Sequence, residues 1–188
     1  MIEVQKRENT ILRKLYATPT RYYHTARHAM YVANAVNVFC KSNGIEPESV
    51  LKAAYWHDAV YVFGESNNEE LSALALLDFD ATQTEAADLI RLTTIDEHLS
   101  DRINFESNPK ASILLDADLV SLSFPYPDFI VHQKRIGLEA GVGYNIVKGH
   151  VDFLQKFLDK ERIFRCPNQE QREKRARMNI EQLIKEYK

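Results

Sequence analysis

Helical periodicity runs through nearly the whole chain and constrains its fold more than any other feature. Residues 25–41 are apolar around most of a helical circumference, a pattern typical of a helix in the middle of a bundle. Runs of alternating apolar and polar residues, which half-buried β-strands require, are scarce. The sequence therefore predicts an all-α protein.

Further helices are expected between the short breaks that glycine and proline mark. Their predicted ranges are 2–16, 47–62, 68–78, 82–98, 110–122, 127–140, 144–159 and 169–187. A chain of 188 residues is long enough for one domain with a substantial core and too short for two full ones. We expect a single helical domain over 1–188, with a core at about 21–160 and a C-terminal helix at about 169–187.

Charge and cysteine content exclude several classes of protein. The formal net charge of −3 gives no global positive field that would recruit nucleic acid or an anionic membrane. No stretch reaches the roughly 18 apolar residues of a membrane span, and the N-terminus lacks the continuous apolar segment of a secretory signal. Only Cys40 and Cys166 are present, without a CxxC pair, so neither a disulfide framework nor a thiolate zinc site is indicated. We expect a cytoplasmic protein without nucleic-acid or membrane partners; the oligomeric state stays open.

Three apolar segments each carry a residue type that binds metals. AAYWHDAVYVF places His57 beside Asp58, RYYHTARHAMYV places His24 and His28 four residues apart on one helical face, and SILLDADLVSL surrounds Asp118 with leucines. Taken alone, such a residue is more often a hydrogen-bonded core residue or a helix cap. An ionised carboxylate in apolar surroundings costs several kcal/mol unless something meets it, and one shared divalent cation would satisfy all three segments together.

These segments resemble the HD superfamily of metal-dependent phosphohydrolases, whose signature is an isolated His, a later His-Asp doublet and a distant Asp. A closer resemblance is to a family of predicted HD phosphohydrolases and spans residues 21–179. Its segments here are RxYHxxxH from Arg21 to His28, HDAVY from His57 to Tyr61, NExxSA from Asn68 to Ala73, DADL from Asp116 to Leu119, and ARxN from Ala176 to Asn179.

The resemblance implies an HD-type helical bundle with a divalent ion, either a transition metal (Mn, Fe, Co, Ni or Zn) or Mg. The implied ligands are His28, His57, Asp58 and Asp118. It also implies hydrolysis of a phosphate ester of a small molecule by a metal-activated water. A nucleotide is the favoured substrate class, on the resemblance alone.

Asp116 and Asp118 cannot be separated as ligands by residue type. Residues two apart on a helix point about 200° apart, so the two are not expected to face one ion together. The resemblance assigns the ligand role to Asp118. Asp116 then either orients a ligating histidine or meets solvent, and the sequence gives the two alternatives equal weight.

Three residues are candidates for the remaining chemistry. Glu69, in the NExxSA match, is the candidate that activates or orients the attacking water, and otherwise an ordinary acid in the first turn of a helix. His24 could donate a proton to the leaving oxygen or contact phosphate. Arg21 could supply positive charge to phosphate in bidentate geometry. Arg177 is a weaker candidate, because EKRARMN has the pattern of an ordinary charged helix face.

His98 bears on the alternative functions. HD proteins with two metals carry further histidines between the doublet and the last Asp, and His98 is the only one in that interval. One histidine favours a mononuclear site, although Glu69 or Asp96 could substitute as an oxygen ligand; equally, His98 could be an ordinary residue at a helix end. The alternatives are a di-iron oxygenase, in which His98 would bind metal, and a ligand-binding domain without turnover. His132 and His150 lie outside the pattern and are expected to be structural or surface residues.

Overall fold

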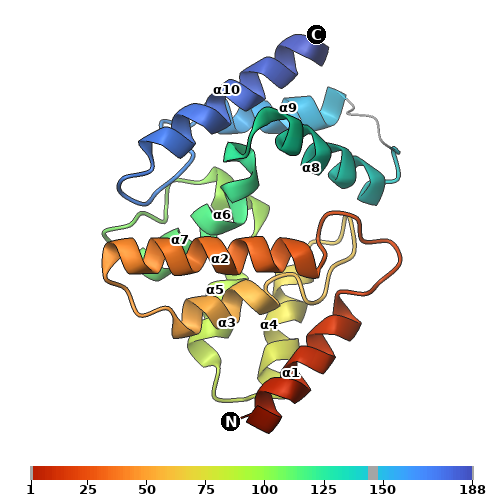
Figure 1. The fold of residues 1–188 in the computed structure, drawn as a ribbon, viewed down its shortest axis with the longest axis vertical. Coiled ribbons are helices and arrows are strands. Elements are labelled where there is room, and N and C mark those ends of the chain that lie inside the picture. The colour runs from red at the N-terminus through yellow and green to blue at the C-terminus, as the bar shows by residue number, and fades with distance from the viewer. Residues whose placement is uncertain (1, 144–147, 188) are drawn as a thin grey trace.

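The computed structural model describes residues 2–143 and 148–187, and their regular structure is entirely helical (Figure 1). The elements are α1 (Ile2–Leu15), α2 (Ala26–Asn43), α3 (Glu48–Trp56), α4 (Asn68–Phe79), α5 (Thr84–Arg91), α6 (Ile95–Leu99), α7 (Pro109–Asp118), the 3-10 helix η1 (Leu119–Ser123), α8 (Tyr126–Glu139), α9 (Lys148–Leu158) and α10 (Glu170–Tyr187). Neither of the two described ranges contains a strand. The predicted all-α fold is confirmed.

Some predicted helices are divided or shortened in the structure. The helix expected over 82–98 is α5 followed by α6, because Thr94 starts a new helix by accepting a hydrogen bond from the Glu97 N–H at 3.3 Å. The helix expected over 110–122 tightens into η1 after Asp118. The first residues of the helix expected over 144–159 lie outside the described residues.

α3 ends at Trp56 rather than at residue 62, so the prediction was wrong for the segment that contains His57 and Asp58. Arg21 donates hydrogen bonds to the carbonyl oxygens of Asp58 at 2.6 Å and of Ala59 at 3.0 Å. A continuing helix would need these carbonyls for its own hydrogen bonds. The two residues therefore lie in a turn after α3.

α2 is the central element of the first core cluster and packs against α3 and α7. Its buried residues are His28, Ala29, Val32, Ala33, Ala35, Val36, Phe39 and Cys40. Trp56 of α3 and Ile113 of α7 are fully buried in the same cluster. The opposite side of α2 reaches the surface at Met30 and Val38, so this helix is buried on one side only.

A second core cluster forms around α9, α10 and η1. In Figure 1, α8, α9 and α10 gather at one end of the molecule and α1, α3, α4 and α5 at the other, with α2 between them. Leu122 of η1 belongs to the second cluster, whereas Ile113 of α7 belongs to the first. Asp118, at the end of α7, therefore lies where the two clusters join.

The structure also bears on the state of the cysteines and on membrane-spanning helices. Cys40 and Cys166 are both buried and free. Among the helices of the described ranges, none has the length and apolar character needed to cross a membrane.

Candidate metal centre

Four of the predicted side chains meet at this junction. His28 comes from the first turn of α2, His57 and Asp58 from the turn after α3, and Asp118 from the last residue of α7. Both histidines are almost completely buried. Three segments that are far apart in the sequence therefore contribute to one cluster.

The distances among His28, His57 and Asp58 fit a single divalent ion, and Asp118 contacts the two histidines. His28 Nε2 lies 3.2 Å from His57 Nε2 and 2.9 Å from Asp118 Oδ1. Asp58 Oδ2 lies 3.0 Å from His57 Nε2 and 3.4 Å from His28 Nε2. Ligand atoms at right angles, each about 2.1 Å from a cation, are about 3.0 Å apart. The observed separations are close to this value.

The two carboxylates approach the histidine pair from different sides. Potential ligand atoms of His28, His57 and Asp58 all lie within 4.8 Å of one another. Asp118 falls outside this set, although its Oδ1 is also 3.4 Å from His57 Nε2. Asp118 therefore lies on the side of the histidines away from Asp58. The cluster of His28, His57 and Asp58 could hold a metal ion, and Asp118 contacts both of its histidines.

The hydrogen bonds in the cluster leave atoms of His57 and Asp58 available to bind a cation. The Nδ1 of His57 lies 2.9 Å from the carbonyl oxygen of Ala54, which can only accept, so Nδ1 carries the proton and Nε2 keeps its lone pair in the neutral ring. Asp58 Oδ2 is buried and has no hydrogen-bond partner, because its 3.0 Å contact with His57 Nε2 lacks hydrogen-bond geometry. A buried carboxylate oxygen without a partner is costly. A cation would satisfy it, so the residues fit a metal.

The pKa shifts of the cluster residues also indicate that a cation would fit here. Burial lowers the pKa of His57, but the carboxylates of Asp58 and Asp118 outweigh burial and raise it well above its usual value. Burial raises the pKa of Asp118, yet His57 and the hydrogen bonds from the histidines hold it well below its usual value. The carboxylates thus favour positive charge on His57, and a divalent cation would supply that charge directly.

Glu69 lies in the first turn of α4 and is half-buried. Burial raises its pKa, and the charges of Asp58 and Asp118 raise it further. Glu70, by contrast, is exposed and pairs with Arg91 at 2.6 Å.

Asn68 and Ser72 of the NExxSA segment hold the loop after the His57-Asp58 doublet, a role that the sequence did not reveal. Ser72 is fully buried; its hydroxyl accepts from the Val60 N–H and donates to the Val60 carbonyl, both at 3.0 Å. Asn68 accepts from the Val62 N–H and donates to the Val62 carbonyl, both at 2.9 Å. These paired bonds tie α4 to the turn that carries the ligands.

The spacing between His24 and His28 suggested that both lie on one face of a helix. In the structure His24 lies before α2 begins. α2 begins at Ala26, and Thr25 at its N-cap is extended, with φ −106° and ψ 172°. The ring of His24 stacks on Tyr61, with centroids 4.0 Å apart, and lies 5.6 Å from the ring of His28. It therefore reaches the cluster from the bend before α2.

Glu139, at the end of α8, fixes this bend and was missed by the sequence analysis. Its Oε2 lies 2.6 Å from His24 Nδ1. Its Oε1 accepts from the backbone N–H groups of Tyr22, Tyr23 and His24 at 2.7, 2.8 and 2.9 Å. Burial lowers the pKa of His24, but the charge of Asp58 and the Glu139 hydrogen bond outweigh it and raise the pKa. No local sequence signal connects residues 115 positions apart.

Arg21 does not have the phosphate-binding geometry that was expected. Its side chain is buried against the rings of Tyr16 and Tyr61, with the guanidinium carbon 5.2 and 5.8 Å from their centroids. Both terminal nitrogens donate to carbonyl oxygens, among them those of Asp58 and Ala59. The bidentate face is therefore occupied, and Arg21 holds the ligand-bearing turn.

Asp116 has neither of the two roles expected for it. It is fully buried and accepts hydrogen bonds from the backbone N–H groups of Arg165 at 2.8 Å and Cys166 at 2.7 Å. The Arg165 guanidinium lies 3.9 Å away, too far for a hydrogen bond. Asp116 thus fixes the segment before α10 and does not face the cluster.

His98 contacts the cluster through the second oxygen of Asp118. It is 3% exposed, and its Nε2 lies 2.9 Å from Asp118 Oδ2. A carboxylate only accepts, so Nε2 carries the proton in this contact. The other nitrogen, Nδ1, is buried without a hydrogen-bond partner. His98 is thus placed beside the predicted ligands, on the far side of Asp118.

Two buried cations hold the short helix α6 that carries His98. Arg165 Nη2 donates to the carbonyl oxygens of Glu97, His98 and Ser100 at 2.7, 3.1 and 3.1 Å. Lys160 Nζ donates to the Ser100 carbonyl at 2.8 Å and also pairs with Asp101 at 2.7 Å. A helix of five residues has little stability of its own, so these contacts fix the position of His98.

The remaining candidates have structural contacts. Arg177 donates to the carbonyl oxygens of Leu158 and Lys160 at 3.1 and 2.7 Å, so it is not a simple solvated residue. His150 Nε2 lies 2.7 Å from Gln133 Oε1. His132 is buried, and burial lowers its pKa to about 4. These contacts give none of the three a place among the metal ligands.

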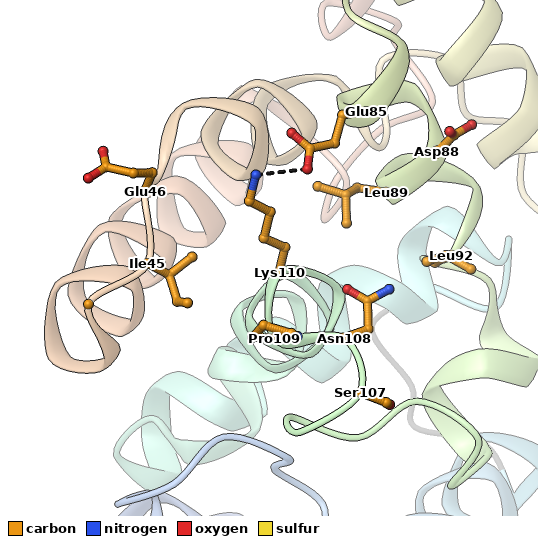
Figure 2. Close-up of a pocket in the computed structure, with 11 residues that line it drawn as sticks. Ile45, Glu46, Glu85, Asp88, Leu89, Leu92, Ser107, Asn108, Pro109 and Lys110 are labelled. Carbon is orange, nitrogen blue, oxygen red and sulfur yellow. Dashed lines mark hydrogen bonds and ion pairs between the residues drawn. The ribbon is translucent and has the colours of Figure 1, made fainter.

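A surface pocket of about 560 Å³ lies elsewhere, at the start of α7 (Figure 2). Glu46, Glu85 and Asp88 line it, and Lys110 is paired with Glu85 at 2.8 Å. Asp118 is at the other end of this helix, about 14 Å away at 1.5 Å per residue. The pocket does not include the cluster and combines no groups that indicate catalysis.

The chain matches none of the protein-family models, curated proteins or solved structures with which it was compared. The interpretation of the site therefore depends on its own geometry. The feature with most weight is the convergence of two imidazole and two carboxylate groups, with one carboxylate oxygen buried and unpaired.

Proposed function

We propose that the protein is a metal-dependent phosphohydrolase of the HD type that hydrolyses a phosphate ester of a small molecule, with nucleotides as the first substrate class to test. The observation that supports this most is the convergence of His28, His57, Asp58 and Asp118 from three segments. Mixed nitrogen and oxygen ligands suit Mn, Fe, Co, Ni or Zn, and Mg is the alternative.

The chain's own residues have distinct parts in the proposed reaction. The residues that would hold the ion are His28, His57, Asp58 and Asp118. A divalent cation at this place supplies charge neutralisation for a phosphoryl oxygen and makes a water more acidic. Glu69 accepts the proton of the attacking water, since burial keeps its pKa above the usual value and makes it a better base. His24 donates a proton to the leaving oxygen.

Metal analysis of the purified protein, coupled to a phosphatase screen over nucleotides with Mn, Co, Ni and Mg, tests this proposal. We expect His57→Ala and Asp58→Ala to lose both bound metal and turnover while the helical circular dichroism spectrum is retained. His150→Ala is the matched control, because His150 bonds to Gln133 outside the cluster. Full metal occupancy in both cluster variants would contradict the metal centre. Bound metal without hydrolysis of any phosphate ester would favour a ligand-binding domain.

His98 supports a second candidate, a di-iron oxygenase. This buried histidine lies 2.9 Å from the Asp118 oxygen that His28 and His57 do not contact. Asp118 and His98 are the residues that would help to hold a second ion. Two iron ions per chain and oxygen-dependent turnover would establish this candidate, whereas one ion per chain excludes it.

A further inference from the structure

Glu139 makes two kinds of contact at once. One oxygen, Oε1, accepts three consecutive backbone N–H groups, those of residues 22–24. The other, Oε2, lies 2.6 Å from His24 Nδ1. The Glu139 side chain is 1% exposed, and that of His24 is 19% exposed. A buried carboxylate thus orients a partly exposed imidazole.

This contact determines where His24 can exchange a proton. A carboxylate oxygen only accepts, so the Nδ1 of His24 carries a proton in both the neutral and the charged ring. Among the described residues, none forms a hydrogen bond with His24 Nε2, and this atom is not one of the buried polar atoms without a partner. Nε2 therefore reaches solvent, while the stacked ring of Tyr61 limits rotation of the imidazole.

We infer that Glu139 is a positioning residue that holds His24 for proton transfer through Nε2 to the leaving oxygen of the substrate. This inference rests on the proposed phosphohydrolase function. As the bond between phosphorus and the leaving oxygen breaks, its electron pair stays on that oxygen, which takes the Nε2 proton. The attacking water gives its oxygen and one proton to the phosphate product and its other proton to Glu69. His24 then regains a proton from solvent and Glu69 returns one.

The variant Glu139→Gln tests the positioning of His24 separately from the hydrogen bonds that Glu139 accepts from the backbone of residues 22–24. The glutamine oxygen can still accept the N–H groups of residues 22–24, whereas its NH₂ group faces His24 and can only donate. The Nδ1 of His24 must then lose its proton, and the charged ring is disfavoured. Histidine-labelled ¹⁵N NMR should show a protonated Nδ1 in the wild-type protein and an unprotonated one in Glu139→Gln. The signal is assigned by its loss in His24→Gln.

Two substrates with different leaving groups supply the kinetic test. p-Nitrophenolate leaves without a proton, whereas an alkoxide needs one. We expect Glu139→Gln to lower kcat for an alkyl phosphate by about 100-fold or more and to change kcat for p-nitrophenyl phosphate little. Metal content should be unchanged. Glu181→Gln, the same substitution at an exposed position of α10, is the control.

A double variant shows whether Glu139 acts through His24. Glu139→Gln should cause no further loss once His24→Gln is present, because residues that act as a unit are not additive. Equal losses for both substrates, additive losses, or an unprotonated Nδ1 in the wild-type protein would each overturn the inference. If the wild-type protein hydrolyses no phosphate ester, the proposed function fails, and the NMR result alone then decides whether Glu139 positions His24.

Discussion

Asp116 and Asp118 are two residues apart on α7, yet they are satisfied in opposite ways. Each oxygen of Asp116 accepts a backbone N–H, from Arg165 and Cys166. Among the described residues, the polar contacts of the Asp118 oxygens are with imidazole nitrogens, including that of His98. The first carboxylate is complete within the protein. The second belongs to a group that a cation would complete.

The residues around Asp116 and Asp118 explain why the two carboxylates differ. Asp116 accepts backbone N–H groups and lies 3.9 Å from the Arg165 guanidinium, a cationic group that does not bind metals. Asp118 contacts histidines, which accept either a proton or a metal. A buried carboxylate beside arginine therefore indicates structure, and one among imidazoles indicates a site.

The largest effect is expected for Asp118→Asn. The amide keeps the shape of the side chain but removes the charge that a metal needs, so metal affinity should fall by more than about 100-fold, beyond the usual effect of residues outside the ligand set. The free energy of unfolding of the metal-free protein should change little only above the raised pKa of His57, because below it the Asp118 carboxylate stabilises the protonated ring. Calorimetric titration with Mn and urea unfolding in a chelator measure the two quantities. Unchanged metal affinity would remove Asp118 from the ligands.

Asp116→Asn should show the reverse pattern. Its NH₂ group faces a backbone N–H of Arg165 or Cys166, leaving a buried donor unsatisfied. The free energy of unfolding should fall by about 3 kcal/mol, as urea unfolding would measure, with metal affinity lowered far less than in Asp118→Asn. If the two asparagine variants behave alike, the division between a structural and a metal-binding carboxylate is wrong.

A change of pH should affect the cluster around Asp118 more than the surroundings of Asp116. The described partners of Asp118 are histidines, whereas those of Asp116 are backbone N–H groups. Burial opposes protonation of His57, but Asp58 and Asp118 raise its pKa. In the metal-free protein this protonation stabilises the fold below the usual histidine pKa, and the contribution is lost as pH rises through the raised pKa. Metal replaces the proton, so affinity should fall about tenfold for each pH unit of acidification while one proton is displaced.

Thermal unfolding with Mn and with a chelator, between about pH 6 and pH 9, measures this linkage. The increase in Tm that metal causes should grow with pH. An increase that is the same across the range would show that metal does not compete with these protons. Asp118→Asn is the matched control, since its Tm should not respond to metal.

The sequence could predict most of the helices, because helical periodicity is a local signal, and the three segments that carry metal-binding residue types; the choice of Asp118 over Asp116 came from the family resemblance. It could not predict where α3 ends, because the carbonyl groups of Asp58 and Ala59 are taken by Arg21, 37 and 38 positions away. The same reason hides Glu139, which meets His24 across 115 positions. Long-range hydrogen bonds leave no periodic trace.

Charged residues were the least predictable group. Arg21 and Asp116 have the residue types of a phosphate ligand and of a metal-site partner, yet both bind backbone groups. A guanidinium or carboxylate satisfies backbone carbonyls or N–H groups as readily as it satisfies a ligand. Residue type alone therefore identifies a candidate, and the neighbouring backbone decides its role.

The smallest effect is expected at His98, which lies between Asp118 and the Arg165 side chain. Arg165 holds its backbone, and its ring contacts Asp118. If His98 only orients Asp118, His98→Ala should lower metal affinity about tenfold at an unchanged one ion per chain. His98→Gln should recover part of the loss, because its amide can still donate to the carboxylate. Metal counting beside titration separates this outcome from the second candidate function, in which both variants would lose one of two ions.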